Sequence, residues 1–240
     1  MSLLSIVQRF YERTNLNTQP PSTVYGSTDP QVLQVKALLE EVGIDLAARG
    51  AWEQITVRAT FNAIADEDQG PITHIATRDF NYIKDRTFWD LSARLPVLGP
   101  LDAEEWEALK AVLVTGPRYY FRILNGNLLL NPAPPLDESM VFEYVSKDWI
   151  VGADGTTYKQ YFTLDTDEPM LPQELLLMGL RAWWKKEKGL DYAEDYRMYE
   201  MQASDALGRN AGNQTLHMDG AGWDGPKPGI WVPQWSWNLP

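Results

Sequence analysis

The chain has 240 residues, a formal net charge of -12 and no cysteine. The lack of cysteine excludes disulfides, thiolate metal sites and cysteine nucleophiles. The negative charge argues against affinity for nucleic acid phosphates, which comes from clustered lysine and arginine, although acidity also serves solubility alone. Ten tryptophans are a further signal, because tryptophan is enriched where protein surfaces meet.

Two helices are predicted at the start of the chain. Apolar residues recur at helical spacing over residues 3–13 with polar residues between them, a pattern typical of an amphipathic helix and not of a signal peptide. After a polar loop, Asp29 and Pro30 supply the N-cap and the first residue of a second helix over residues 30–49. No window approaches 18 uninterrupted apolar residues, so we expect no membrane span.

The middle of the chain is predicted to be antiparallel sheet, drawn from roughly residues 54–164. Apolar and polar residues alternate from Ile55 to Asn62, which indicates a half-buried strand. Further strand-like pieces are expected around residues 72–75 and 81–90, and residues 96–100 are expected to form a turn. Asp102 has the capping-box spacing to Glu105 and therefore predicts a short helix.

Two hairpins are also expected in this region. Asn125-Gly126 lies between the strand-like segments 119–124 and 128–131 and supplies the positive φ angles that a two-residue hairpin turn needs. A second hairpin is expected around Asp154-Gly155, with residues 141–146 and 158–162 as its arms.

Two more helices are predicted over residues 172–188 and 191–207. Gly189 ends the first of them and Asp191 caps the second, so the pair should form an antiparallel helical hairpin. One face of the second helix carries the tyrosines Tyr192, Tyr196 and Tyr199.

Residues 211–240 form an arm rich in glycine, proline and tryptophan, in which no regular element is expected. Three interpretations apply: the arm packs on its own chain as a strap, it stacks on sugars, or it buries its rings on a neighbouring subunit or partner. The last is favoured because such rings serve as interface anchors, and an exposed arm would promote aggregation. The candidate partner-binding residues are Trp223, Ile230, Trp231, Val232, Trp235, Trp237 and Leu239.

Signals of catalysis are weak. A serine triad would have to use His74 or His217, and the sequence holds neither a Gly-x-Ser-x-Gly turn nor a phosphate-binding loop. The acidic runs 66–68 and 165–168 could hold calcium or hydrolyse glycosides, but neither has the EF-hand spacing, and solvated acidic turns are commoner. We therefore expect no catalytic residue, no cofactor and no metal site.

Four strings, taken in order and spacing, resemble a known family: Gly26–Val32; Leu98–Leu101 followed by Glu105, Trp106 and Leu109; Phe142–Lys147; and Lys188–Tyr196. Over roughly residues 1–210 the chain resembles the head-to-tail connector proteins of tailed bacteriophages, also called neck adaptors or head completion proteins. These are related in plan to the tubular tail A proteins of short-tailed phages.

The resemblance implies an α+β fold without enzymatic activity, in which helices from both chain ends form a bundle around an inserted antiparallel β domain. We place the N-terminal helices at 1–51, the β domain at 52–170, the C-terminal helical hairpin at 171–210 and the extended arm at 211–240.

The implied role is a twelve-fold ring under the portal protein, in the neck of the virion, after assembly in the host cytoplasm. Its partners would be the portal, neighbouring copies of the chain, a tail or second neck protein, and genomic DNA passing through the channel without specific binding. No membrane is involved. The alternative is a glycan-binding or glycoside-cleaving virion protein that uses the tryptophan arm and the acidic loops.

Overall fold

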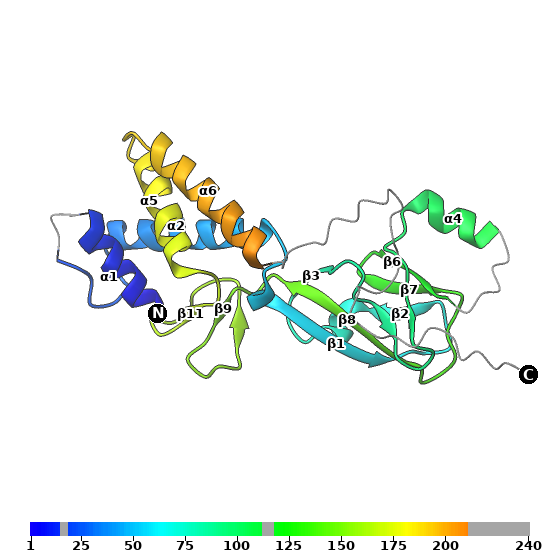
Figure 1. Cartoon of the computed structure of the whole chain (residues 1–240). Helices are drawn as coiled ribbons and strands as arrows, with labels where there is room; N and C mark the ends of the chain where they lie inside the picture. The colour runs from blue at the N-terminus through cyan, green and yellow to red at the C-terminus, as the bar shows by residue number, and fades with distance from the viewer. Residues whose placement is uncertain (15–18, 112–117, 211–240) are drawn as a thin grey trace, which may run out of the picture.

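The structure, a computed structural model, describes residues 1–14, 19–111 and 118–210. It confirms the predicted α+β fold: helices from both ends of the chain form one lobe, and antiparallel strands from the middle form most of the other (Figure 1). Within the described residues, no helix has the length and apolar character needed to cross a bilayer.

The helices are α1 (Leu3–Thr14), α2 (Pro30–Ala48), α3 (Ile72–Ile75), α4 (Ala103–Ala111), α5 (Gln173–Glu187) and α6 (Ala193–Asn210), with a 3-10 turn at Glu53–Ile55. The strands are β1 (Thr56–Asn62), β2 (Asp68–Pro71), β3 (Phe80–Ile83), β4 (Trp89–Asp90), β5 (Leu95–Pro96), β6 (Tyr120–Leu124), β7 (Asn127–Asn131), β8 (Ser139–Ser146), β9 (Ile150–Val151), β10 (Tyr158–Lys159) and β11 (Glu168–Pro169).

The first two helices begin and end close to where the sequence predicts. Asp29 caps α2 by accepting a hydrogen bond from the Gln31 N–H at 2.9 Å, and Pro30 takes the first helical position, where a missing N–H leaves no bond unmade. Both helices bury their apolar stripes in one core. The buried residues include Leu3, Ile6, Val7 and Phe10 of α1 and Val35, Leu39, Val42 and Leu46 of α2.

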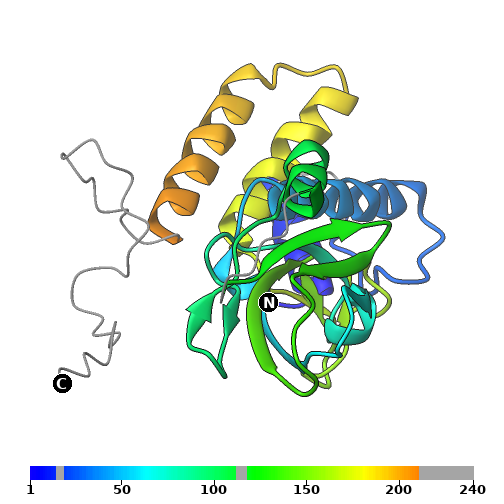
Figure 2. The ribbon, with the colours of Figure 1, turned by 90° about the vertical axis from the view of Figure 1, so that its right-hand side faces the viewer.

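α5 and α6 form the predicted helical hairpin, which projects from the body of the molecule (Figure 2). Gly189 makes the turn with a φ of +67°, a left-handed conformation that glycine adopts without strain. Gly179 of α5 lies against Val42 of α2 on one side and Tyr199 of α6 on the other. The helices from the two parts of the chain therefore share one core.

The β lobe is built around β8, which pairs antiparallel with β1 over the full length of that strand and also with β3 and β4. A second sheet has the order β2-β7-β6. Its β6–β7 hairpin is the predicted one: Asn125 and Gly126 have φ values of 51° and 81°, as a two-residue turn requires. The two sheets share a second core, in which Phe88, Phe121, Leu128, Leu130 and Phe142 are buried.

Two predictions in the middle of the chain are wrong. Residues 72–75 form the short helix α3 instead of a strand, closed by a 2.8 Å hydrogen bond from the Ala76 N–H to the Ile72 carbonyl. The second hairpin also has a different first strand from the predicted one. β8 pairs with β1, β3 and β4 instead, and β9 pairs with β10 across the Asp154-Gly155 turn.

The segment after β8 packs with the helices, although the sequence predicts it to be part of the β domain. Trp149, Ile150, Phe162 and Leu171 are all buried in the helical core. The predicted β segment 52–170 therefore contributes to both cores, and the chain crosses from the β lobe to the helical lobe directly after β8.

Candidate functional site

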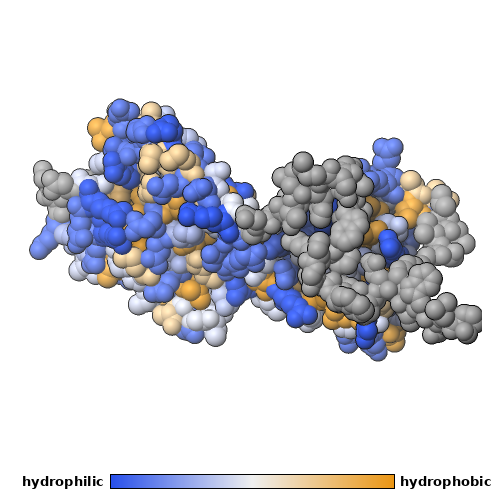
Figure 3. Space-filling view, in the orientation of Figure 1, coloured by the Kyte–Doolittle hydropathy of each residue, from blue (hydrophilic) through white to orange (hydrophobic). Residues whose placement is uncertain are grey.

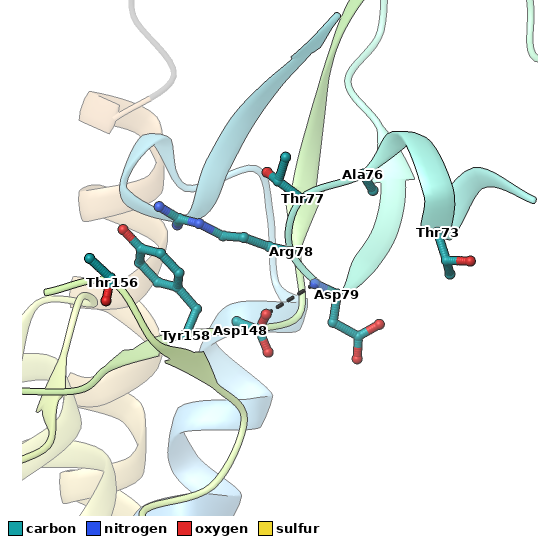
Figure 4. Close-up of a pocket in the computed structure, with 8 residues that line it drawn as sticks. All are labelled: Thr73, Ala76, Thr77, Arg78, Asp79, Asp148, Thr156 and Tyr158. Carbon is teal, nitrogen blue, oxygen red and sulfur yellow. Dashed lines mark hydrogen bonds between the residues drawn. The ribbon is translucent and has the colours of Figure 1, made fainter. Parts of the chain in front are cut away.

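A cavity of about 420 Å³ lies where the two lobes meet (Figure 4). The loop between α3 and β3 supplies one side, and the segments around the end of β8 and the start of β10 supply the other. The lining residues are Thr73, Ala76, Thr77, Arg78, Asp79, Asp148, Thr156 and Tyr158.

Arg78 fixes one wall of this cavity to the other. Its guanidinium lies over the ring of Tyr158, 3.2 Å from the ring centroid, in a cation–π contact that Figure 4 shows from the side. The backbone N–H of Arg78 donates to the hydroxyl of the buried Tyr144 at 2.8 Å. A loop of the β lobe is thus attached both to β8 and to the small sheet under the helices.

The acidic side chains of the cavity are engaged in the same joint. Asp148, which is 7% exposed, accepts a hydrogen bond from the Asp79 N–H at 3.0 Å (Figure 4). Ser146 accepts from the Asp148 N–H and donates to the Asp79 carbonyl, both at 3.0 Å. The described lining holds no histidine, lysine or cysteine. These contacts make the cavity a structural joint between the two lobes.

The acidic run 165–168 holds the helical lobe together. Asp165 accepts hydrogen bonds from the Thr23 hydroxyl at 2.6 Å and from backbone N–H groups of the same loop. Asp167 is fully buried and accepts from the Lys159 ammonium at 2.9 Å. Burial acts to raise the pKa of Asp167, but the bonds from Lys159 and from backbone N–H groups outweigh it and hold that pKa below its usual range.

The other acidic run, 66–68, is also bonded within the chain. Glu67 forms an ion pair with Lys110 of α4 at 2.8 Å, and Asp68 accepts a hydrogen bond from the Asn127 amide at 2.8 Å. In the part of the chain that the structure describes, no group of three or more histidine, aspartate or glutamate side chains is placed to hold a metal ion.

A second hollow, of about 230 Å³, lies near the tip of the α5–α6 hairpin, and we call it the aromatic cleft. Its lining residues are Ala182, Trp183, Lys186, Tyr192 and Tyr196. The ring centroids of Trp183 and Tyr196 are 5.6 Å apart, with the rings tilted by 43°. Trp183 also packs edge-on against the buried Tyr199 at 5.8 Å, which fixes the position of its ring.

The sequence places the tyrosines of this cleft on one helix face but does not bring Trp183 to them. The contact depends on how α5 and α6 are aligned, which is decided by their packing on α2. The available signal is a tryptophan eight residues before the aspartate that caps the tyrosine-bearing helix, because a tight helical hairpin brings such positions side by side.

The predicted partner-binding residues lie outside the described residues. They are Trp223, Ile230, Trp231, Val232, Trp235, Trp237 and Leu239. His217 falls in the same segment, whereas His74 is exposed on α3.

Comparison of the chain with models of known protein families finds no match, and comparison with curated proteins finds none either.

Proposed function

We propose that this chain is a structural virion protein that forms a ring beneath the portal, joins the phage head to the tail and continues the DNA channel. The observation that carries the proposal is the architecture. α1 and α2 share one core with α5 and α6, and the strands of the β lobe are inserted between them in the chain. Neck adaptors have this plan, and the four sequence strings of the resemblance follow the same order along it.

The partners follow from this role. The ring contacts the portal on one side, a tail or second neck protein on the other, and neighbouring copies of itself laterally. The arm, with Trp223, Trp231, Trp235 and Trp237, docks on the portal or the adjacent subunit, since aromatic side chains are the usual anchors of such interfaces.

The acidic charge suits a DNA channel. Twelve copies with a charge of -12 each carry -144, and a channel lined by part of that charge repels DNA phosphates, so that the duplex slides without binding. On the face seen in Figure 3, hydrophilic residues cover most of the helical lobe, with apolar residues scattered between them.

Within the described residues, neither acidic run favours the alternative, a glycan-binding or glycoside-cleaving virion protein. The carboxylates of Asp165, Asp167 and Asp68 accept hydrogen bonds from their own chain, which supports a structural use of both acidic runs. Quenching of tryptophan fluorescence by oligosaccharides would instead favour the alternative.

The test is to mix the purified chain with the portal protein of the same phage and to image the product by electron microscopy. Full-length chain should add a ring of density under the portal. A variant that lacks residues 223–240 should add little or none, because the arm supplies the anchor. Portals that remain bare with the full-length chain would contradict the proposal. If both chains formed rings equally well, the arm would not be the anchor on the portal.

A further inference from the structure

We propose that, in the unassembled protein, the proline-rich segment Pro226–Pro233 docks in the aromatic cleft of its own chain. The inference concerns the free protein and does not depend on ring formation. It names an occupant for the aromatic cleft, which lies away from the contact between the two lobes.

The chemistry of the cleft suits proline. Tyr192 and Tyr196 are each 39% exposed, and Trp183 is half-buried between them and the helical core. Grooves lined by tryptophan and tyrosine bind extended proline-rich segments, because prolyl rings stack on the aromatic faces and the segment loses little conformational entropy. A volume of about 230 Å³ is below the roughly 300–1,000 Å³ of clefts for drug-sized ligands and suits one or two prolyl rings.

The segment Pro226–Pro233 has the matching composition. It contains Pro226, Pro228 and Pro233, with Ile230 and Trp231 between them. Exposed to water, these apolar side chains would promote association between chains. Docking on the hairpin covers part of this apolar surface until a partner is met.

The length of the chain allows the segment to reach its own cleft. α6 ends at Asn210, and Tyr196 lies fourteen residues earlier, which is about 21 Å along the helix at about 1.5 Å per residue. The sixteen residues from Asn210 to Pro226 span up to about 53 Å when extended. A tether of this length gives an effective concentration in the millimolar range, so the same chain outcompetes a second copy in dilute solution.

The absence of cysteine makes a disulfide test clean. Two full-length double variants are compared under mild oxidation: Lys186→Cys with Gly229→Cys, and Glu187→Cys with Gly229→Cys. Glu187 is exposed next to Lys186 but is not part of the cleft lining, and it points about 100° around the helix. The cleft pair should form an internal disulfide in the monomer about tenfold faster than the control pair.

Adding Tyr192→Ala to the cleft pair should abolish this advantage, because an exposed ring of the cleft is lost while the core is unchanged. Circular dichroism shows that all variants are folded. Equal rates for the two pairs, an advantage that survives Tyr192→Ala, or disulfides that join two chains would each overturn the proposal. Ring formation on the portal is measured in a separate experiment. Failure of the docking proposal can therefore be distinguished from failure of the proposed function.

Discussion

Gly43 of α2 lies directly against the indole ring of Trp149, so closely that a Cβ on Gly43 would overlap the ring. Trp149 follows β8, is fully buried and packs edge-on against Phe162 at 5.3 Å. The first residues that leave the β lobe are thus anchored under α2. This contact is the apolar part of the joint between the lobes, and Arg78 with Tyr158 is the polar part.

Gly43→Ala should destabilise the protein by about 1–3 kcal/mol, because the added methyl group must displace a buried ring in a packed core. Gly208→Ala is the matched control. It also lies in a helix, and a Cβ there meets no atom within 4 Å, so the free energy of unfolding should rise by about 0.5–1 kcal/mol. Urea denaturation measures both. A Gly43→Ala protein as stable as the wild type would show that Trp149 does not require this contact.

Arg49 joins the end of α2 to α6, and Arg49→Lys should weaken that link. The guanidinium binds both carboxylate oxygens of Glu200, at 2.6 and 2.7 Å, and its Nε donates to Asp45 at 2.9 Å. A lysine ammonium cannot reproduce this fork, so we expect a loss of about 1.5–3 kcal/mol, the range for hydrogen bonds between charged groups.

The control for Arg49 is Arg209→Lys. Arg209 pairs with Asp205 on the surface of α6 with 77% of its side chain exposed, and surface pairs of this kind contribute about 0–1 kcal/mol. If the two lysine variants unfolded at the same urea concentration, Arg49 would have no special role in the bundle.

Glu138 gives the β lobe a predictable response to pH. Burial raises the pKa of Glu138 and the nearby Asp90 carboxylate adds to the rise, while the Tyr119 hydroxyl, which donates to Glu138 at 2.8 Å, acts against it. Asp90 is 1% exposed, and its Oδ2 has no hydrogen-bond partner within the described residues, so a proton on Glu138 would supply the missing donor.

The direction in which stability changes with pH follows from the raised pKa of Glu138. The folded state binds the proton more tightly than the unfolded chain, whose glutamate pKa is about 4.3, so this contribution to stability is complete below that pH and is lost as pH rises through the folded-state pKa. Glu138→Gln should therefore be more stable than the wild type at pH 7, and the difference should shrink as pH falls towards 4. Urea denaturation of both proteins from pH 4 to 7 measures this difference in the free energy of unfolding. A difference that stays constant over this pH range would contradict the prediction.

The helices could be predicted because their end signals are local. Asp29 with Pro30, Asp102 with Glu105 and Gly189 all act within one turn, and the structure contains each of these bonds or turns. The β6–β7 hairpin was predictable for the same reason, since Asn125-Gly126 fixes its register.

The features that could not be predicted from the sequence depend on contacts between residues that are far apart in the chain. No residue near Asp154-Gly155 indicates that β8 is already paired with β1, and so the sequence predicts the wrong first arm for this hairpin. Trp149 gives no local sign of its place under Gly43. The alignment of Trp183 with Tyr196 likewise depends on packing between helices.

The most direct test of the proposed ring is the mass of the complex with the portal, measured by native mass spectrometry. Twelve chains of 27.3 kDa would add about 328 kDa to the portal ring, which is the increment that the proposed closed ring of twelve requires. We predict that increment, in one step, without partly filled rings. A portal whose mass is unchanged after mixing would contradict the proposed function.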